Sequence, residues 1–281
     1  MASTLRTTLL PAIASAVALV LVWIGTYRID FTSWFDRGVQ SGFIGLDDTR
    51  VGEWADLLVH LADPLPFAVV SLALIGVALL RRRPRHALMA AAILGGANVT
   101  TQVLKRLTEG PRAYDVTSWA GNLGYELWPS GHTTAAMTLA LCLVLVVPRQ
   151  ARPVAAAVGG CFAVSVVYSL MVLAWHLPSD SVGGFFVATG WTFGVLTVAR
   201  LAERRWPVPA RREPALGPVA VLWPVAAVTA CGAVAVLAVA VSRPGQTIGH
   251  AIEHSAFVFG APLMALLALS LAGGVALSLR R

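Results

Sequence analysis

Eight long apolar stretches constrain the fold of this chain more than any other feature. A helix that crosses the hydrocarbon core of a bilayer needs about 20 apolar residues, and each stretch is close to that length. Because 57% of the residues are hydrophobic and only 12% are charged, the composition excludes a soluble globular protein. We therefore predict an all-α fold, a polytopic membrane helix bundle. The stretches are residues 9–27, 56–80, 87–104, 131–148, 154–174, 181–200, 217–241 and 257–278.

The positions of the arginines predict how this bundle is oriented. The chain has a net charge of +7, and its arginines cluster directly after every second apolar stretch. By the positive-inside rule these clusters and both termini are cytoplasmic, in a multi-pass protein of the cell (cytoplasmic) membrane. The charge therefore indicates orientation, with the bilayer as partner and no nucleic acid. The loops expected on the extracytoplasmic side are residues 28–55, 105–130, 175–180 and 242–256.

An Arg- and Pro-rich segment divides the chain into two predicted parts. Residues 1–200 would form a six-transmembrane-helix core, residues 201–216 a basic cytoplasmic linker, and residues 217–281 an additional, appended transmembrane helix pair. Segment 28–55 carries aromatic residues among charges, which is typical of an interfacial helix on the outer leaflet or of an ordinary loop. Glycine pairs inside the stretches, such as Gly183–Gly184, predict close helix packing.

Three polar clusters lie between the apolar stretches, and the predicted topology places all of them on the outer side. Ionisable side chains beside membrane spans are expensive, so they indicate chemistry. Two imidazoles, a carboxylate and two cations are expected to converge there. The clusters are Lys105 with Arg112, then Pro129-Ser130-Gly131-His132, and His176 with Asp180.

The first two clusters have the chemistry of an anion site. Ser130 is placed to cap a helix, and Gly131 lets a ligand approach the free N–H groups of that helix terminus, which attract phosphate. Lys105 and Arg112 add fixed positive charge. A tetrahedral oxyanion is the natural guest, because phosphoryl transfer needs its dispersed charge stabilised.

The third cluster has the chemistry of an activated nucleophile. Pro178 should break the chain between two helices and leave His176 close to Asp180, whose carboxylate can hold one imidazole nitrogen. The other nitrogen is then available to attack. His132 can protonate the departing oxygen and later activate water.

In these motifs the chain resembles the type 2 phosphatidic acid phosphatases, integral membrane lipid phosphatases related to vanadium-dependent haloperoxidases. The signature of that family is K-x6-R-P, then P-S-G-H, then S-R-x5-H-x3-D. The resemblance covers roughly residues 9–200, and the ordered set of three motifs is specific. The chain reads Lys105-x6-Arg112-Ala113, Pro129-Ser130-Gly131-His132, and Ser169-Leu170-x5-His176-x3-Asp180.

The resemblance implies a role for each of these residues. His176 would form a phosphohistidine intermediate, Asp180 would orient it, and His132 would be the general acid. The resemblance implies no metal and no cofactor. The phosphate would be bound by Lys105, Arg112, Ser130 and Gly131.

Two positions depart from the family signature. Ala113 replaces a proline, which is a minor change in loop stiffness. Leu170 stands where the family places a phosphate-binding arginine, so one fixed positive charge is missing. Arg106, next to Lys105, or a charge on the substrate could replace it. The loss is also compatible with a weakly active or inactive relative.

Two further groups of ionisable residues lie outside the signature. His60 and Asp63, one helical turn apart, are either candidate substrate contacts or a buried hydrogen-bonded pair that locks helices together. His250, Glu253 and His254 spell H-x-x-E-H, the pattern of inverted zinc peptidases. Because no further ligand candidate accompanies them, we interpret this pattern as a coincidence.

The residues together predict a function and two alternatives to it. We predict a membrane lipid phosphate phosphohydrolase that acts at the extracytoplasmic face on a polyprenyl diphosphate, phosphatidylglycerol phosphate, phosphatidic acid or a related phospholipid. One alternative is a lipid phosphotransferase, in which an alcohol resolves the phosphohistidine. The other is a non-catalytic transporter or scaffold that retains an anion pocket. The headgroup, the tail, the oligomeric state and the role of the last two helices stay open.

Overall fold

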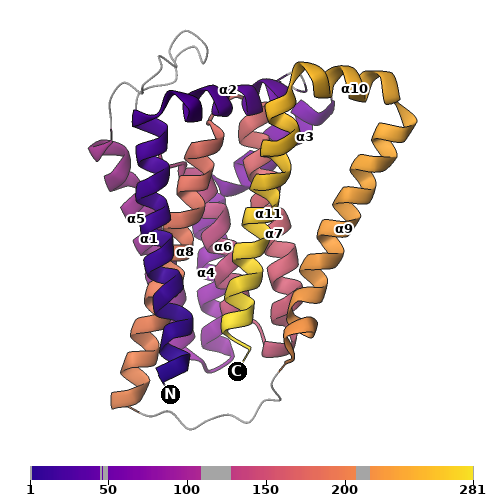
Figure 1. Cartoon of the computed structure of the whole chain (residues 1–281). Helices are drawn as coiled ribbons and strands as arrows, with labels where there is room; N and C mark the ends of the chain where they lie inside the picture. The colour runs from indigo at the N-terminus through magenta and orange to yellow at the C-terminus, as the bar shows by residue number, and fades with distance from the viewer. Residues whose placement is uncertain (1, 45, 47–49, 109–127, 207–215, 281) are drawn as a thin grey trace.

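The computed structural model describes residues 2–44, 46, 50–108, 128–206 and 216–280, and in these ranges every regular element is a helix. The predicted all-α helix bundle is therefore confirmed (Figure 1). The α-helices are α1 (Ala2–Arg28), α2 (Asp30–Ile44), α3 (Arg50–Val59), α4 (Pro64–Leu80), α5 (Pro84–Leu107), α6 (Gly131–Val146), α7 (Arg152–Val172), α8 (Pro178–Arg205), α9 (Pro218–Ser242), α10 (Pro244–Glu253) and α11 (Ser255–Ser278). Two short 3₁₀ helices, η1 (His60–Ala62) and η2 (Arg149–Ala151), precede α4 and α7.

All eight predicted stretches are mainly helical, but residues 56–80 are bent and residues 131–148 form a helix shorter than the other spans. Within the described residues six helices are long and apolar enough to cross a membrane, namely α1, α5, α7, α8, α9 and α11. The stretch 56–80 is bent instead: Arg50–Ala62 and Pro64–Leu80 meet at 56°. The bend lies at Asp63, because Pro64 opens α4 with a fixed φ and no N–H to leave unsatisfied. Helix length and composition make the chain a multi-pass membrane protein.

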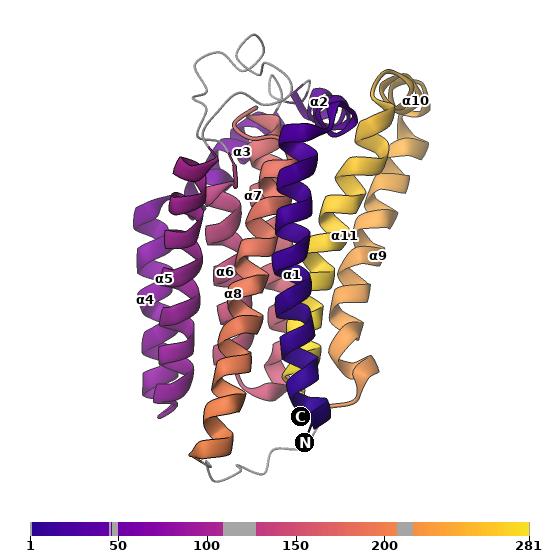
Figure 2. The same cartoon turned by 60° about the vertical axis from the view of Figure 1, so that its left-hand side comes forward.

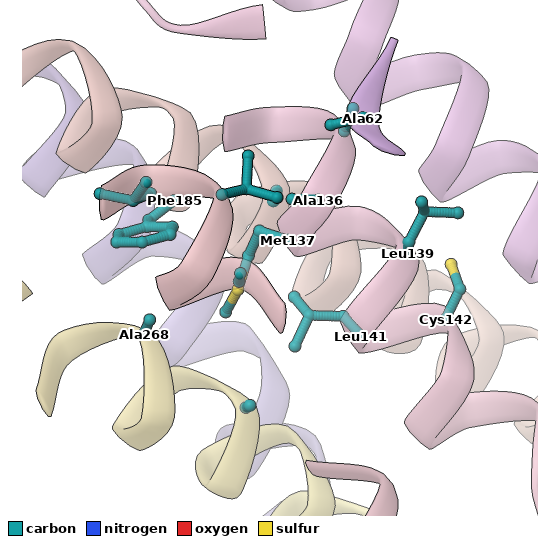
Figure 3. Packing of buried hydrophobic residues seen from close by; sticks show 14 of the residues in the cluster. Ala62, Ala136, Met137, Leu139, Leu141, Cys142, Phe185 and Ala268 are labelled. Atoms are coloured by element: carbon teal, nitrogen blue, oxygen red, sulfur yellow. The ribbon is translucent and has the colours of Figure 1, made fainter. Parts of the chain in front are cut away.

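Helix α6 is the centre of the bundle. It is only 16 residues long and mostly apolar, and almost all of its side chains are buried, as expected for a helix enclosed by others. Its neighbours are α4, α5, α7, α8 and α11. Figure 3 shows Met137 and Leu141 of α6 in one buried cluster with Phe185 of α8 and Ala268 of α11.

Helix α11 is packed into this bundle, whereas α9 lies along its outside. α11 contacts α7, α2 and α6, and two arginines bind the carbonyls at its C-terminal end. Arg152 donates to Leu279 O at 2.6 Å and Arg200 to Ser278 O at 2.8 Å, which satisfies groups that a helix end leaves unpaired. In α9 most side chains are exposed. The predicted division of the chain at residues 201–216 stays a prediction.

Segment 28–55 forms two helices, α2 and α3, which favours the helical interpretation over the loop. Figures 1 and 2 show α2 lying across the end of the bundle, opposite the end where α1 begins and α11 ends. Phe31 and Trp34 are exposed on it, and its buried face carries Asp36 and Gln40. Both side chains form hydrogen bonds to the turn between α7 and α8.

Candidate active site

The start of α6 is held against the start of α8. The Ser130 hydroxyl oxygen accepts a hydrogen bond from the backbone N–H of Thr133 at 3.3 Å, so Ser130 caps α6 as predicted. The backbone N–H of Ser130 donates to the carbonyl of Asp180 at 2.9 Å. Gly131 then opens the helix, and the N–H groups of this terminus suit a bound anion. The two helix starts therefore form one rigid unit.

A close approach of two backbones makes this unit possible. A Cβ atom placed on Gly184 of α8 would lie 2.9 Å from the Ser130 carbonyl oxygen and 3.1 Å from the Thr134 nitrogen. Both are backbone atoms, which cannot move aside as the end of a side chain can. Close packing at the Gly183–Gly184 pair was predicted, and the structure places it directly beneath the candidate site.

We expect Gly184→Ala to separate α6 from α8 and to lower both stability and activity. Overpacking against backbone costs about 1–3 kcal/mol, and the shift would also misalign Ser130 with Asp180. Thermal unfolding in detergent and phosphate release from a lipid phosphate measure the two effects. Gly194→Ala is the matched control, because a Cβ on Gly194, also in α8, meets nothing within 4 Å. Equal behaviour of the two variants would contradict this account.

His176 and Asp180 meet across the turn that joins α7 to α8. Pro178 is the first residue of α8, which is the break that the sequence predicted. His176 Nδ1 lies 3.3 Å from Asp180 Oδ2, and the same oxygen accepts the backbone N–H of Leu177 at 2.9 Å. His176 is 7% exposed and Asp180 is fully buried. With Nδ1 facing the carboxylate, Nε2 is the nitrogen left for chemistry.

The surroundings of His176 favour its neutral form. Burial lowers the pKa of His176, the Asp180 carboxylate acts in the opposite direction, and positive charge on Lys105 and His132 lowers it further. A neutral imidazole keeps the lone pair that a nucleophile needs.

His132 has a carboxylate partner that the family signature does not contain. Its Nε2 lies 3.0 Å from Asp63 Oδ1, while the other oxygen of Asp63 lies 2.8 Å from His60 Nδ1. Hydrogen bonding from His132 is the main reason why the pKa of Asp63 is lowered. His60 and Asp63 thus form the predicted hydrogen-bonded pair. They are not buried, however, since their side chains are 49% and 36% exposed.

Trp175 lies between these two histidines. Its ring centroid is 5.8 Å from that of His60 and 5.8 Å from that of His132. Its position depends on the turn after α7, where Ala174 has φ of 54° and the Trp175 N–H donates to the Leu170 carbonyl at 2.9 Å. Sequence analysis did not single out Trp175, although it directly precedes the candidate nucleophile.

Helix α2 also binds the His176 turn. Gln40 donates to the backbone carbonyl of His176 at 3.1 Å, and Asp36 accepts the backbone N–H of Ser179 at 3.1 Å as well as its hydroxyl. Asp36 and Gln40 are one helical turn apart and buried. Sequence analysis missed both residues. The available signal was an acid and an amide on one face of an amphipathic helix.

The predicted phosphate-binding cations are placed only in part. Lys105 lies half-buried in the last turn of α5, and Arg106 beside it is exposed. Arg112, and Ala113 with it, lies outside the described residues. Leu170, at the position of the family arginine, is fully buried in the apolar cluster, so its side chain is part of the packing between helices.

The H-x-x-E-H pattern has other partners. His254 Nδ1 lies 3.0 Å from the hydroxyl of Ser41 in α2, and the rings of His250 and His254 are 4.5 Å apart. Across the part of the chain that the structure describes, no group of three or more His, Cys, Asp or Glu side chains has the arrangement of a metal site.

Comparison with known proteins identifies the segment that carries the site. The family model of the PAP2 superfamily matches residues 86–205. This part of the chain is similar to the PAP2 superfamily. The match runs from α5 through α8 and includes Lys105, Ser130, His132, His176 and Asp180. The family resemblance read from the three motifs is thereby confirmed.

The PAP2 match indicates the class of chemistry. Phosphatases of this superfamily hydrolyse phosphate esters, and their substrates are often lipids. A search of curated proteins and a search of solved structures gave no match. Helices α1 to α4, which include Asp63, and helices α9 to α11 lie outside the matched segment.

Proposed function

We propose that this PAP2 protein is a membrane lipid phosphate phosphohydrolase that works through a phosphohistidine at the extracytoplasmic face. The observation that carries the proposal is the pair formed by buried His176 and Asp180, beside the N-terminus of α6 and within the field of Lys105. A neutral imidazole with one nitrogen held by a carboxylate is an activated nucleophile. A helix N-terminus and a fixed cation provide the charge that a transferring phosphoryl group requires.

The proposed reaction has two steps. In the first, His176 Nε2 forms a bond to phosphorus, the bond from phosphorus to the leaving oxygen breaks, and His132 gives that oxygen a proton. In the second, water attacks the phosphohistidine, His132 takes a proton from the water, and the N–P electron pair returns to Nε2. Phosphate leaves and both histidines are restored. Asp180 stabilises the positive charge on His176 in both steps.

The arrangement of charge supports a site outside the cytoplasm. Arg152 and Arg200 lie at the end of the bundle where α11 ends, and the positive-inside rule assigns that end to the cytoplasm. The His176 turn lies at the opposite end, under α2. A lipid whose tail stays among the helices could present its phosphate there without leaving the bilayer. Candidate substrates are polyprenyl diphosphates, phosphatidylglycerol phosphate and phosphatidic acid.

Phosphate release from a lipid panel tests this proposal. The purified full chain in detergent should release inorganic phosphate from at least one of these lipids. A competing alcohol should not divert the phosphoryl group, since transfer to the alcohol would indicate the phosphotransferase. Silence across the panel, with the protein still folded, would favour the non-catalytic alternative.

A further inference from the structure

We propose that Asp63, held in place by His60, is the positioning residue of the general acid His132. The inference rests on the proposed function, because it assumes that His132 protonates the leaving group. It adds to that function a carboxylate from outside the matched PAP2 segment. In this arrangement each of the two proposed catalytic histidines has its own carboxylate partner, Asp180 for His176 and Asp63 for His132.

The contacts around Asp63 are those of an orienting carboxylate. Its two oxygens are divided between two imidazoles, at 3.0 Å from His132 Nε2 and 2.8 Å from His60 Nδ1. Asp63 lies at the bend, since η1 ends at Ala62 and α4 begins at Pro64. The bend brings its carboxylate to the two histidines. His60 is steadied in turn by Asp56, 3.5 Å from its Nε2, and by the ring of Trp175.

The contact at Nε2 determines which atom of His132 exchanges protons. A carboxylate that accepts from Nε2–H fixes that tautomer and leaves Nδ1 to exchange protons with substrate and water. In the first step Nδ1–H would give its proton to the leaving oxygen as the P–O bond breaks. In the second step Nδ1 would take a proton from the attacking water. Asp63 itself keeps its charge and stabilises the imidazolium that exists before the first step and after the second.

A purely structural role predicts a different pattern. A carboxylate that only locked helices together would be buried away from solvent, whereas Asp63 and His132 are partly exposed, at 36% and 26% of their side chains. Its loss would also slow every substrate equally. A positioning role for a general acid makes the loss depend on how much the leaving group needs a proton.

The test compares two phosphate monoesters that differ in their leaving group. One is a long-chain alkyl phosphate, whose alkoxide must be protonated, and the other is a nitrophenyl phosphate with a comparable chain, whose phenolate leaves without help. We expect Asp63→Asn to lower kcat/KM for the alkyl phosphate by about 10²-fold, within the range of general acid catalysis. For the nitrophenyl phosphate kcat/KM should be nearly unchanged, because kcat/KM includes only the steps up to the phosphohistidine, and hydrolysis of that intermediate is common to both esters. Asp63→Glu should restore part of the loss.

Two controls separate the possible outcomes. Glu53→Gln removes an exposed carboxylate from α3 and should leave both reactions unchanged. Adding Asp63→Asn to His132→Ala should cause no further loss with the alkyl phosphate, because the two residues act as one unit. An equal loss of kcat/KM on both substrates, or full additivity with His132→Ala, would overturn the role of Asp63. Failure of the wild-type protein to cleave either ester would overturn the proposed function itself.

Discussion

His176→Ala is expected to abolish phosphate release, with a loss on the order of 10⁴-fold or more. The physical reason is that no other group in the described site combines burial, a neutral imidazole and a carboxylate on one nitrogen. Without Nε2 the phosphoryl group has no covalent acceptor, and water would have to attack the ester directly. Steady-state phosphate release from a responsive lipid phosphate measures the loss.

Trapping the intermediate makes this prediction specific. Wild-type protein quenched during turnover of a radiolabelled lipid phosphate should carry label that acid removes and alkali does not, as expected for a phosphohistidine. The His176→Ala variant should carry none. It should still fold, because Gln40 binds the backbone carbonyl of His176, which alanine also has. Turnover that survives in this variant would refute the covalent mechanism.

His132→Ala provides the comparison, since it removes the proposed general acid and leaves the proposed nucleophile in place. Its expected loss is smaller, about 10²–10⁴-fold. Label should accumulate on His176 if His132 is needed more for the attack of water than for departure of the leaving group. The two histidines are therefore distinguishable by labelling as well as by rate.

The sequence could predict the parts of the fold that depend on local pattern. Apolar length alone located every spanning helix, and Pro178 correctly predicted the break before α8. The pair of His176 and Asp180 was also accessible, because the two residues are four apart and the proline start of α8 fixes the turn between them. Ser130 as a helix cap followed from the same kind of local rule.

The contacts that complete the site could not be predicted, because they join segments far apart in the chain. Asp63 reaches a histidine 69 residues away, and Gln40 binds a carbonyl 136 residues away. No hydrophobic periodicity and no motif spacing in the sequence indicates either contact. The sequence predicts Asp63, with His60, as a substrate contact or as part of a buried pair, but the bend at Pro64 that directs it to His132 depends on how α3 and α4 pack. Trp175 depends likewise on the turn after α7.

These distant contacts explain why helices outside the PAP2 segment belong to the site. The matched helices α5 to α8 supply the candidate nucleophile, acid and anion site. Helix α2 anchors the His176 turn through Gln40 and Asp36, and the α3–α4 bend supplies Asp63. The chemistry thus lies in the matched segment, whereas part of its orientation comes from the N-terminal helices.

Asp180→Asn is the second change for which we expect a large effect, about 10²–10⁴-fold in kcat. The amide is nearly isosteric and its oxygen can still accept the Leu177 N–H, which now donates to Asp180 Oδ2 at 2.9 Å. The capping of α8 should therefore survive. Because the same oxygen faces His176 Nδ1, the amide can keep that hydrogen bond too, and what is lost is the negative charge that stabilises positive His176 during phosphoryl transfer. Phosphate release and thermal unfolding measure the two properties separately.

The pH dependence of this variant separates an electrostatic role from a structural one. Burial lowers the pKa of His176, and the Asp180 carboxylate opposes that effect. Removing the carboxylate therefore lowers the pKa of His176 further, so the neutral nucleophile persists to more acidic pH. The acidic limb of the pH profile of kcat/KM should move to lower pH while the maximum falls. A variant that lost activity through misfolding would keep the wild-type limb on its residual activity, and a shift to higher pH would show that Asp180 does not act on His176 by its charge.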